Sequence, residues 1–298
     1  MFNLSANAFG LHKTFAGSEE NMSSIKSAPV GVFDSGVGGL TVAREIMRQL
    51  PDERIVYFGD TARVPYGSKS KENILKYSRQ IVKFLKSKGV KAIVVACNTA
   101  SALALDEIKH EIDIPIIGVV KPGARTAVRS THNKRIGVIA TDATIKSELY
   151  TEYIHELDES ITVVGQACPL FVPLVEEGML HDEVTDEMAK RYLSGLKTEN
   201  IDTLILGCTH YPLLRSTVGR IMGDKVTLIN PAYETAMRLK ELLEDKNLNF
   251  EGKLDMDENE KYEFFVSDAG GKFRTFANSI LPFDIDTITQ VEIEEYIV

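Results

Sequence analysis

The chain has 298 residues, of which 44% are hydrophobic, and a formal net charge of −9 at pH 7. This length and hydrophobic content suit one or two globular domains with substantial cores. The sequence has no basic cluster and no run of about 18 apolar residues, which argues against direct binding of nucleic acid and against a membrane span. A small acidic ligand is compatible with the negative charge, because helix N-termini and other local donors can bind it.

The chain begins with a polar leader, residues 1–28, that lacks the apolar centre of a signal peptide. We interpret this leader as a mobile tail or an accessory surface segment, and we expect a cytoplasmic protein. The three cysteines, Cys97, Cys168 and Cys208, form no CxxC pair, and their odd number fits free thiols in a reducing compartment. Cys208 and His210 do not have a zinc-site spacing, so we expect no metal ion.

Eight short Val- and Ile-rich runs alternate with longer segments along the chain. Their continuous apolar character is typical of strands that are buried on both faces. Residues 70–88 have apolar residues at helical spacing, and Gly89 supplies a C-terminal stop. This alternation predicts an α/β fold with mostly parallel sheets flanked by helices. The predicted strands are 30–35, 54–59, 92–97, 114–120, 135–140, 161–166, 202–208 and 225–230.

Three features recur in the same order at offsets of about 110 residues. Ordered matches at nearly equal offsets predict two similar lobes. The last segments, 262–268, 273–281 and 291–297, are expected to complete one of these lobes. The recurring features are a strand opening at Gly31 and Gly137, a cysteine at Cys97 and Cys208, and the pattern P-x-x-x-T-A at 122–127 and 231–236.

The polar clusters of the sequence lie at the ends of predicted strands. In open α/β sheets, ligands bind beyond the carboxyl ends of the strands, so these clusters form the candidate site. Gly36, Gly38 and Gly39 follow the first strand, and they allow the backbone to approach a ligand closely. In chain order the clusters are Asp34-Ser35, Tyr66-Gly67, Cys97-Asn98-Thr99, Thr141 and Cys208-Thr209-His210.

Cys97 and Cys208 each follow a predicted strand and precede a predicted helix. The N-terminal dipole of such a helix favours thiolate over thiol, so we expect a modest decrease from the ordinary thiol pKa of about 8.5. Two such thiols, one from each lobe, could face each other across a cleft. That arrangement suits inversion of a stereocentre, in which one thiolate removes an α-proton and the opposite thiol delivers one.

Each candidate residue also has a structural interpretation. A lone cysteine at a strand end is often a small buried hydrophobe, but the paired placement of two cysteines favours the catalytic interpretation. Cys168 has no counterpart, and we interpret it as structural or pocket-lining. The other polar candidates could be helix caps, turn residues or satisfied polar groups, and these are Asp34, Tyr66, Asn98, Thr99 and His210.

Five long motifs span much of the chain: VFDSGVGGL (32–40), YFGDTARVPYG (57–67), VVACNTAS (94–101), ACPLFVPLVE (167–176) and LGCTHYPLL (206–214). Together, and in this order, they resemble the glutamate racemases that work without pyridoxal phosphate. The motif CTHYP distinguishes the sequence from the related aspartate racemases.

The resemblance implies interconversion of L- and D-glutamate without a cofactor, which supplies D-glutamate for bacterial peptidoglycan. It implies that Cys97 and Cys208 transfer the protons, with Asp34 assisting Cys97 and His210 assisting Cys208. Glu176 lies in a matching stretch. The resemblance also implies substrate contacts by Asp34, Ser35, Tyr66, Gly67, Asn98, Thr99, Thr141, Thr209 and His210.

The resemblance further implies an interleaved layout with the active site in the cleft between the lobes. Residues 29–122 and 232–298 are expected to form the first lobe, and residues 123–231 the second. We also expect a homodimer. Some members with N-terminal extensions depend on a muramic-acid nucleotide precursor as activator, and the extension 1–28 is a candidate for this purpose.

Two alternatives stay open, a racemase for aspartate and a non-catalytic two-lobed binding protein for an acidic metabolite. Comparing the turnover of glutamate with that of aspartate distinguishes an aspartate racemase from a glutamate racemase. A binding protein would bind glutamate but would not exchange its α-proton. A thiol oxidoreductase is disfavoured because the sequence has no CxxC pair. No lysine stands in a recognisable setting for pyridoxal phosphate.

Overall fold

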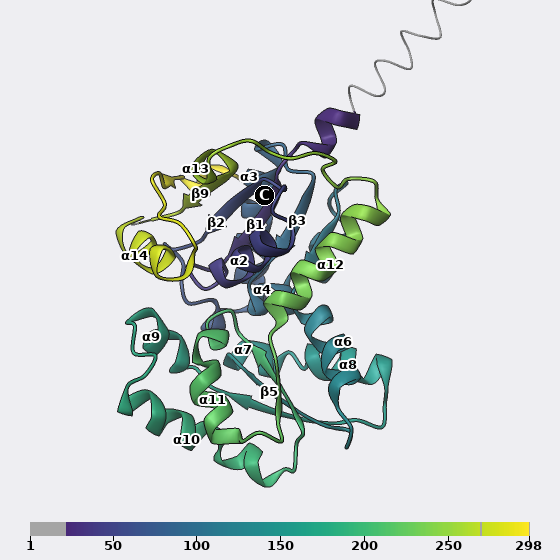
Figure 1. Cartoon of the computed structure of the whole chain (residues 1–298), viewed down its shortest axis with the longest axis vertical. Helices are drawn as coiled ribbons and strands as arrows, with labels where there is room; N and C mark the ends of the chain where they lie inside the picture. Colours follow the sequence, from purple (N-terminus) through teal and green to yellow (C-terminus); the bar gives the residue numbers. More distant parts are fainter. Residues whose placement is uncertain (1–21, 269, 298) are drawn as a thin grey trace, which may run out of the picture.

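The structure is a computed structural model that describes residues 22–268 and 270–297, so most of the leader lies outside the described residues. The chain forms two lobes, each a parallel sheet flanked by helices (Figure 1). The predicted fold class is therefore confirmed. Each of the eight predicted strands is present at its expected place in the chain. Among the described residues, no helix is both long and apolar enough to cross a membrane.

The first lobe is built on a six-stranded sheet in the order β10-β9-β2-β1-β3-β4, with every pair parallel. Its strands are β1 (Val30–Asp34), β2 (Ile55–Gly59), β3 (Ala92–Val95), β4 (Ile116–Gly118), β9 (Tyr262–Val266) and β10 (Thr289–Gln290). Its helices are α2 (Leu40–Gln49), α3 (Lys71–Ser87), α4 (Asn98–Leu103), α5 (Leu105–Ile108), α12 (Pro231–Asp245), α13 (Glu258–Lys261) and α14 (Gly270–Ile280), with 3-10 turns η1 (Tyr66–Ser68) and η3 (Ile293–Glu295).

The second lobe is built on a four-stranded parallel sheet in the order β6-β5-β7-β8. Its strands are β5 (Arg135–Ala140), β6 (Thr162–Ala167), β7 (Thr203–Gly207) and β8 (Thr227–Ile229). Its helices are α6 (Val120–Ser130), α7 (Asp142–Lys146), α8 (Leu149–Leu157), α9 (Phe171–Glu176), α10 (Glu183–Thr198) and α11 (Arg215–Met222), with the 3-10 turn η2 (Tyr211–Leu214).

Strands β1 and β3 show why their sequences are apolar without alternation. Val30 and Val32 of β1 pack into one core cluster, whereas Phe33 packs into a second cluster on the other face of the sheet. In β3, Val94 and Val95 divide between the same two clusters. Because helices cover both faces, every side chain of these strands is buried, and both strand ends open on the same edge of the sheet.

The two lobes are joined by chain crossings near β4 and β8, and α12 lies along the first lobe down to the junction (Figure 1). Helix α12 packs against α2 and also against α6. Strand β9, from the end of the chain, pairs with β2. The exact lobe boundaries, 29–122 with 232–298 and 123–231, stay a prediction.

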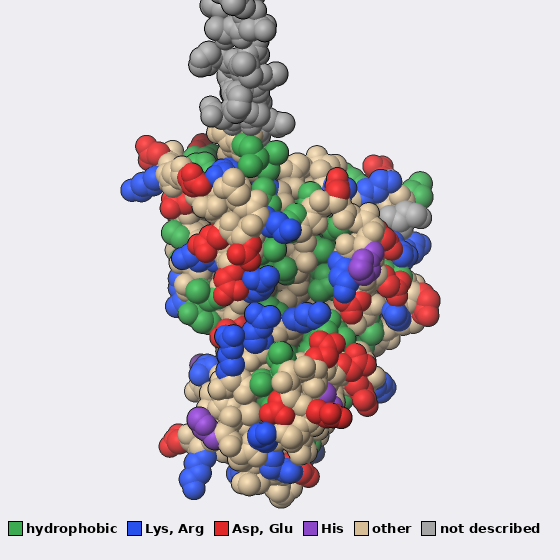
Figure 2. Space-filling model, turned by 90° about the vertical axis from the view of Figure 1, so that its right-hand side faces the viewer, with side chains coloured by type: hydrophobic (Ala, Val, Ile, Leu, Met, Phe, Trp, Pro, Cys, Tyr) green, Lys and Arg blue, Asp and Glu red, His purple; other side chains and the backbone are tan. Residues whose placement is uncertain are grey.

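Lysine and arginine side chains gather on the face where the lobes meet, as Figure 2 shows. A cavity of about 340 Å³ at this junction has both basic and acidic walls but no cysteine among its described residues. It therefore lacks the groups on which the predicted chemistry depends. Its charged walls are Asp106, Lys109, Lys121, Arg125, Arg129, Glu234, Arg238 and Glu241.

Candidate active site

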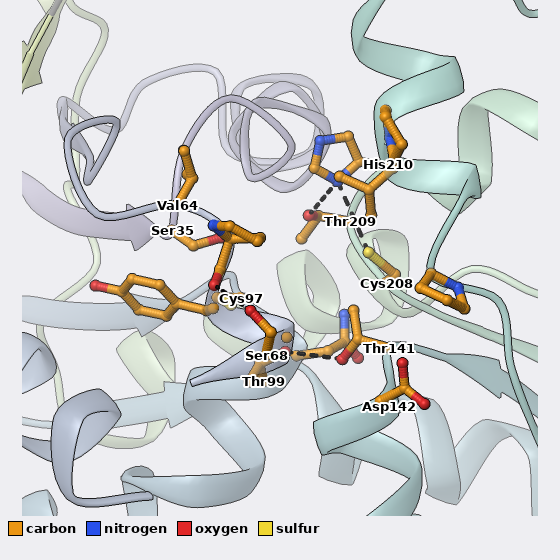
Figure 3. Close-up of a pocket in the computed structure, with 18 of the residues that line it drawn as sticks. Ser35, Val64, Ser68, Cys97, Thr99, Thr141, Asp142, Cys208, Thr209 and His210 are labelled. Atoms are coloured by element: carbon orange, nitrogen blue, oxygen red, sulfur yellow. Dashed lines mark hydrogen bonds between the residues drawn. The ribbon is translucent and has the colours of Figure 1, made fainter. Parts of the chain in front are cut away.

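A second cavity, of about 400 Å³, opens between the lobes and contains nearly all the predicted site residues. Loops that follow β1, β2 and β3 meet loops that follow β5 and β7, and Cys97 and Cys208 lie on opposite sides of it (Figure 3). None of the described lining residues is a lysine or an arginine. The predicted residues that line it are Ser35, Tyr66, Gly67, Cys97, Asn98, Thr99, Thr141, Glu176, Cys208, Thr209 and His210.

Cys97 lies at the N-cap of α4, where its Sγ accepts a hydrogen bond from the backbone N–H of Ala100 at 3.5 Å. The sequence predicted a lowered thiol pKa, and this prediction is wrong for the ligand-free protein. Burial and the negative charge of Asp34 raise the pKa of the Cys97 thiol to about 12, because they outweigh the Ala100 amide. Cys97 is therefore a thiol at neutral pH.

Cys208 does not precede a helix directly, because a 3-10 turn begins at Tyr211. Its neighbour is instead His210, whose Nδ1 lies 3.7 Å from the Cys208 Sγ, while Nε2 lies 2.9 Å from Oε1 of Glu176. Burial alone lowers the pKa of His210, but the hydrogen bonds to Cys208 and Glu176 prevail and raise the pKa to about 10. A side-chain cation, rather than the predicted helix dipole, therefore stands beside the second thiol.

Asp34 is fully buried and is the one predicted contact residue that does not line the cavity. Its Oδ2 accepts the backbone N–H of Gly36 at 3.0 Å, and its Oδ1 has no hydrogen-bond partner among the described residues. Burial raises the pKa of Asp34, with the charge of His210 acting in the opposite direction. The carboxyl group therefore lies behind the cavity, where its charge acts on Cys97.

The prediction that the glycines after β1 approach a ligand fits Gly36 but not Gly38 or Gly39. Gly36 lines the cavity, but Gly38 and Gly39 do not. A Cβ on Gly38 would lie 2.3 Å from the Thr209 hydroxyl and 2.5 Å from the His210 ring. Gly38 is thus needed for close approach of the two lobes rather than of a ligand.

The loop after β2 closes the cavity from one side. Tyr66 is buried, and its hydroxyl donates to Oδ2 of Asp60, so this proton is not available to a ligand. Gly67 lies against the second lobe, because a Cβ there would come within 2.9 Å of the Cβ of Thr141. The backbone of this loop therefore fills the gap between the lobes without a side chain at Gly67.

Three threonine hydroxyls form a hydrogen-bonded cluster across the lobe junction. Thr99 Oγ1 lies 3.0 Å from Thr141 Oγ1, and Thr144 Oγ1 lies 3.3 Å from Thr99 and 3.0 Å from Thr141. The sequence interpretation identified Thr99 and Thr141 but missed Thr144. The sequence does indicate Thr144, because it stands three residues after Thr141, which caps a helix.

The remaining lining residues were not predicted from the sequence. Cys168 is buried and does not line the cavity, which favours its structural interpretation over the pocket-lining one. The unpredicted lining residues are largely apolar, and only Ser68 and Asp142 add polar groups. They are Val64, Pro65, Ser68, Asp142, Pro169, Val172 and Pro173.

Two parallel α/β lobes with two cysteines that line the cavity between them suit an enzyme that moves a proton between the two faces of a carbon. The family model described as Asp/Glu/Hydantoin racemase matches residues 31–239. The chain belongs to this family, and it is an amino-acid racemase. The predicted resemblance is confirmed.

Similar proteins cover nearly the whole chain. Glutamate racemase from Geobacter metallireducens is 46% identical over 265 residues, which are 89% of this chain and 97% of that protein. The crystal structure of glutamate racemase isoform RacE1 from Bacillus anthracis matches with a TM-score of 0.84 and 42% identity, over 90% of this chain and 98% of that one.

Two further structures hold ligands. Glutamate racemase from Francisella tularensis, in complex with D-glutamate, matches with a TM-score of 0.83 and 40% identity, over 91% of this chain and 100% of that one. The Escherichia coli enzyme, in complex with L-glutamate and the activator UDP-MurNAc-ala, matches with a TM-score of 0.72 and 28% identity, over 89% and 98% of the chains.

Proposed function

We propose that the protein is a cofactor-independent glutamate racemase that supplies D-glutamate for peptidoglycan. The observation that carries the proposal is that Cys97 and Cys208, from different lobes, line one cavity. Thiols on opposite sides of a carbon can act as base and acid in turn. The similarity to proteins named glutamate racemase supports glutamate as the substrate.

In the proposed mechanism, the two thiols exchange roles between the two directions of reaction. Cys208 lies beside the His210 imidazolium, whereas Cys97 is a thiol. Cys208 removes the α-proton of one enantiomer, and Cys97 protonates the opposite face. In reverse, Asp34 accepts the Cys97 proton and His210 donates one to Cys208, so that Cys97 becomes the base and Cys208 the acid.

The substrate is held without a lysine or arginine. Backbone amides, hydroxyl groups and the Asn98 amide can donate hydrogen bonds to its two carboxylates, and the same fixed dipoles stabilise the carbanion-like transition state. We assign these contacts to Asp34, Ser35, Tyr66, Gly67, Asn98, Thr99, Thr141, Thr209 and His210. Because Asp34 lies behind the cavity, it acts on the substrate through its neighbours.

The first experiment is exchange of the α-proton in deuterium oxide without added cofactor, followed by NMR and circular dichroism. We expect the protein to racemise L- and D-glutamate with deuterium uptake, and to turn over aspartate at least about a hundredfold more slowly, since one missing methylene misplaces a carboxylate. Preferred turnover of aspartate would establish the aspartate racemase instead. Binding of glutamate without exchange would establish the binding protein.

We also propose a homodimer and activation by a muramic-acid nucleotide. The Escherichia coli complex with UDP-MurNAc-ala supports the second part. If the extension 1–28 mediates activation, its deletion removes the increase in racemisation that UDP-MurNAc-ala produces and leaves basal activity unchanged. An unchanged response would exclude the extension, and sedimentation velocity of the same samples measures the oligomeric state.

A further inference from the structure

The side chain of Asn98 is held by a residue of the opposite lobe. Within residues 22–268 and 270–297, its only hydrogen bond is with Tyr150, whose hydroxyl donates to Oδ1 of Asn98 at 2.7 Å. Asn98 is the first residue of α4, and Tyr150 belongs to α8. Both residues are buried, so the bond joins the lobes in a region that water does not reach freely.

Tyr150 has little freedom to move. A Cβ on Gly207 would lie 3.2 Å from the Tyr150 ring, and a Cβ on Gly123 would lie 3.5 Å from its hydroxyl. Both glycines therefore make room for the tyrosine. Burial raises the pKa of Tyr150, so its hydroxyl keeps the proton that it donates to Asn98.

The bond decides which end of the Asn98 amide is available to a ligand. An amide carries one acceptor oxygen and one donor NH2 group in the same plane. Tyr150 occupies the oxygen, whereas the NH2 group has no hydrogen-bond partner among the described residues, although Asn98 lines the cavity. A carboxylate only accepts hydrogen bonds, so it is attracted by the NH2 group and repelled by the oxygen.

We propose that Tyr150 is a positioning residue that fixes the Asn98 amide with its NH2 group toward a substrate carboxylate. This inference rests on the proposed function, because it assumes an amino-acid substrate in the cavity that Asn98 lines. Tyr150 of the second lobe thus determines which hydrogen-bonding group Asn98 of the first lobe presents to the substrate. Without Tyr150 the amide can rotate, and part of the population presents its oxygen to the carboxylate.

The test is Tyr150→Phe, which removes the hydroxyl and keeps the ring. We expect KM to rise about tenfold for both enantiomers and kcat to change less than about twofold, since a carboxylate contact is made in the ground state and the transition state alike. Tyr153→Phe is the matched control. Tyr153 is on the same helix, and its hydroxyl contacts Asp106, which does not line the cavity.

A double-mutant cycle separates positioning from a general structural effect. In an Asn98→Ala background, Tyr150→Phe is expected to leave KM unchanged, because no amide remains to be oriented. An equal rise in KM in both backgrounds, or no rise in the single variant, would overturn the inference. Calorimetric titration with D-glutamate measures the same changes without turnover when Cys97→Ala and Cys208→Ala are added to each variant. If the wild type binds glutamate but does not racemise it, only the proposed function fails, and absence of binding overturns both.

Discussion

Replacing Cys97 or Cys208 with alanine is expected to reduce racemisation of glutamate by at least about a thousandfold, because each variant lacks the acid or base on one face of the α-carbon. L- and D-glutamate have equal free energies, so the loss must be the same in both directions. The remaining thiol can still remove a proton and return it to the same face. Each variant is therefore expected to exchange the α-proton of one enantiomer only, and the two variants to serve opposite enantiomers.

Two measurements check this prediction separately. NMR follows deuterium uptake by each pure enantiomer, and circular dichroism follows the loss of its dichroic signal as it racemises. Cys168→Ala is the control, because this third cysteine is buried outside the cavity and its loss should leave racemisation within about twofold of wild type. Racemisation that survives removal of either Cys97 or Cys208 would contradict the two-thiol mechanism.

Replacing His210 with asparagine is expected to lower kcat by about a hundredfold. The variant loses the imidazolium beside Cys208 and the link from Cys208 through His210 to Glu176. Because the equilibrium constant of a racemisation is one, kcat/KM must fall equally for both enantiomers. The asymmetry appears instead in the deuterium isotope effect, which should increase for the enantiomer whose α-proton Cys208 removes.

The pH dependence gives a second measurement on the same variant. The pKa of His210 is raised to about 10, so the imidazolium is present at neutral pH and is lost as the pH rises through that value. Wild-type activity should therefore decline above about pH 10, and the His210→Asn variant should lack this His210-dependent decline. Equal isotope effects for the two enantiomers in the variant would show that His210 serves both thiols alike.

Much of the site could be predicted from the sequence because parallel strands bring their carboxyl ends to one edge. Cys97 and Thr99 follow β3, Thr141 follows β5 and Cys208 follows β7, and the structure brings them to one cavity. The raised pKa of Cys97 could not be predicted, because it depends on complete burial and on Asp34, whose position relative to the thiol is set by the fold. The helix dipole, from which a lowered pKa was predicted, depends only on the local chain.

Tyr150 shows a different limit of sequence reasoning. In the sequence it is one apolar position of an amphipathic helix, and a buried tyrosine is usually a core residue. Its contact with Asn98 exists only because the two lobes pack together. The same holds for Gly38, whose missing side chain is explained by Thr209 and His210 from the other lobe. Residues that act across the junction leave no local pattern.

The pairing of β9 with β2 has a consequence for the order in which the protein is made. All four strands of the second sheet lie between Arg135 and Ile229, so the ribosome completes them before it reaches β9. Until then one edge of β2 has no partner, although β1, β3, β4 and the whole second sheet are already present. An open strand edge invites pairing with other chains, so the nascent first lobe is exposed to aggregation until β9 has been made.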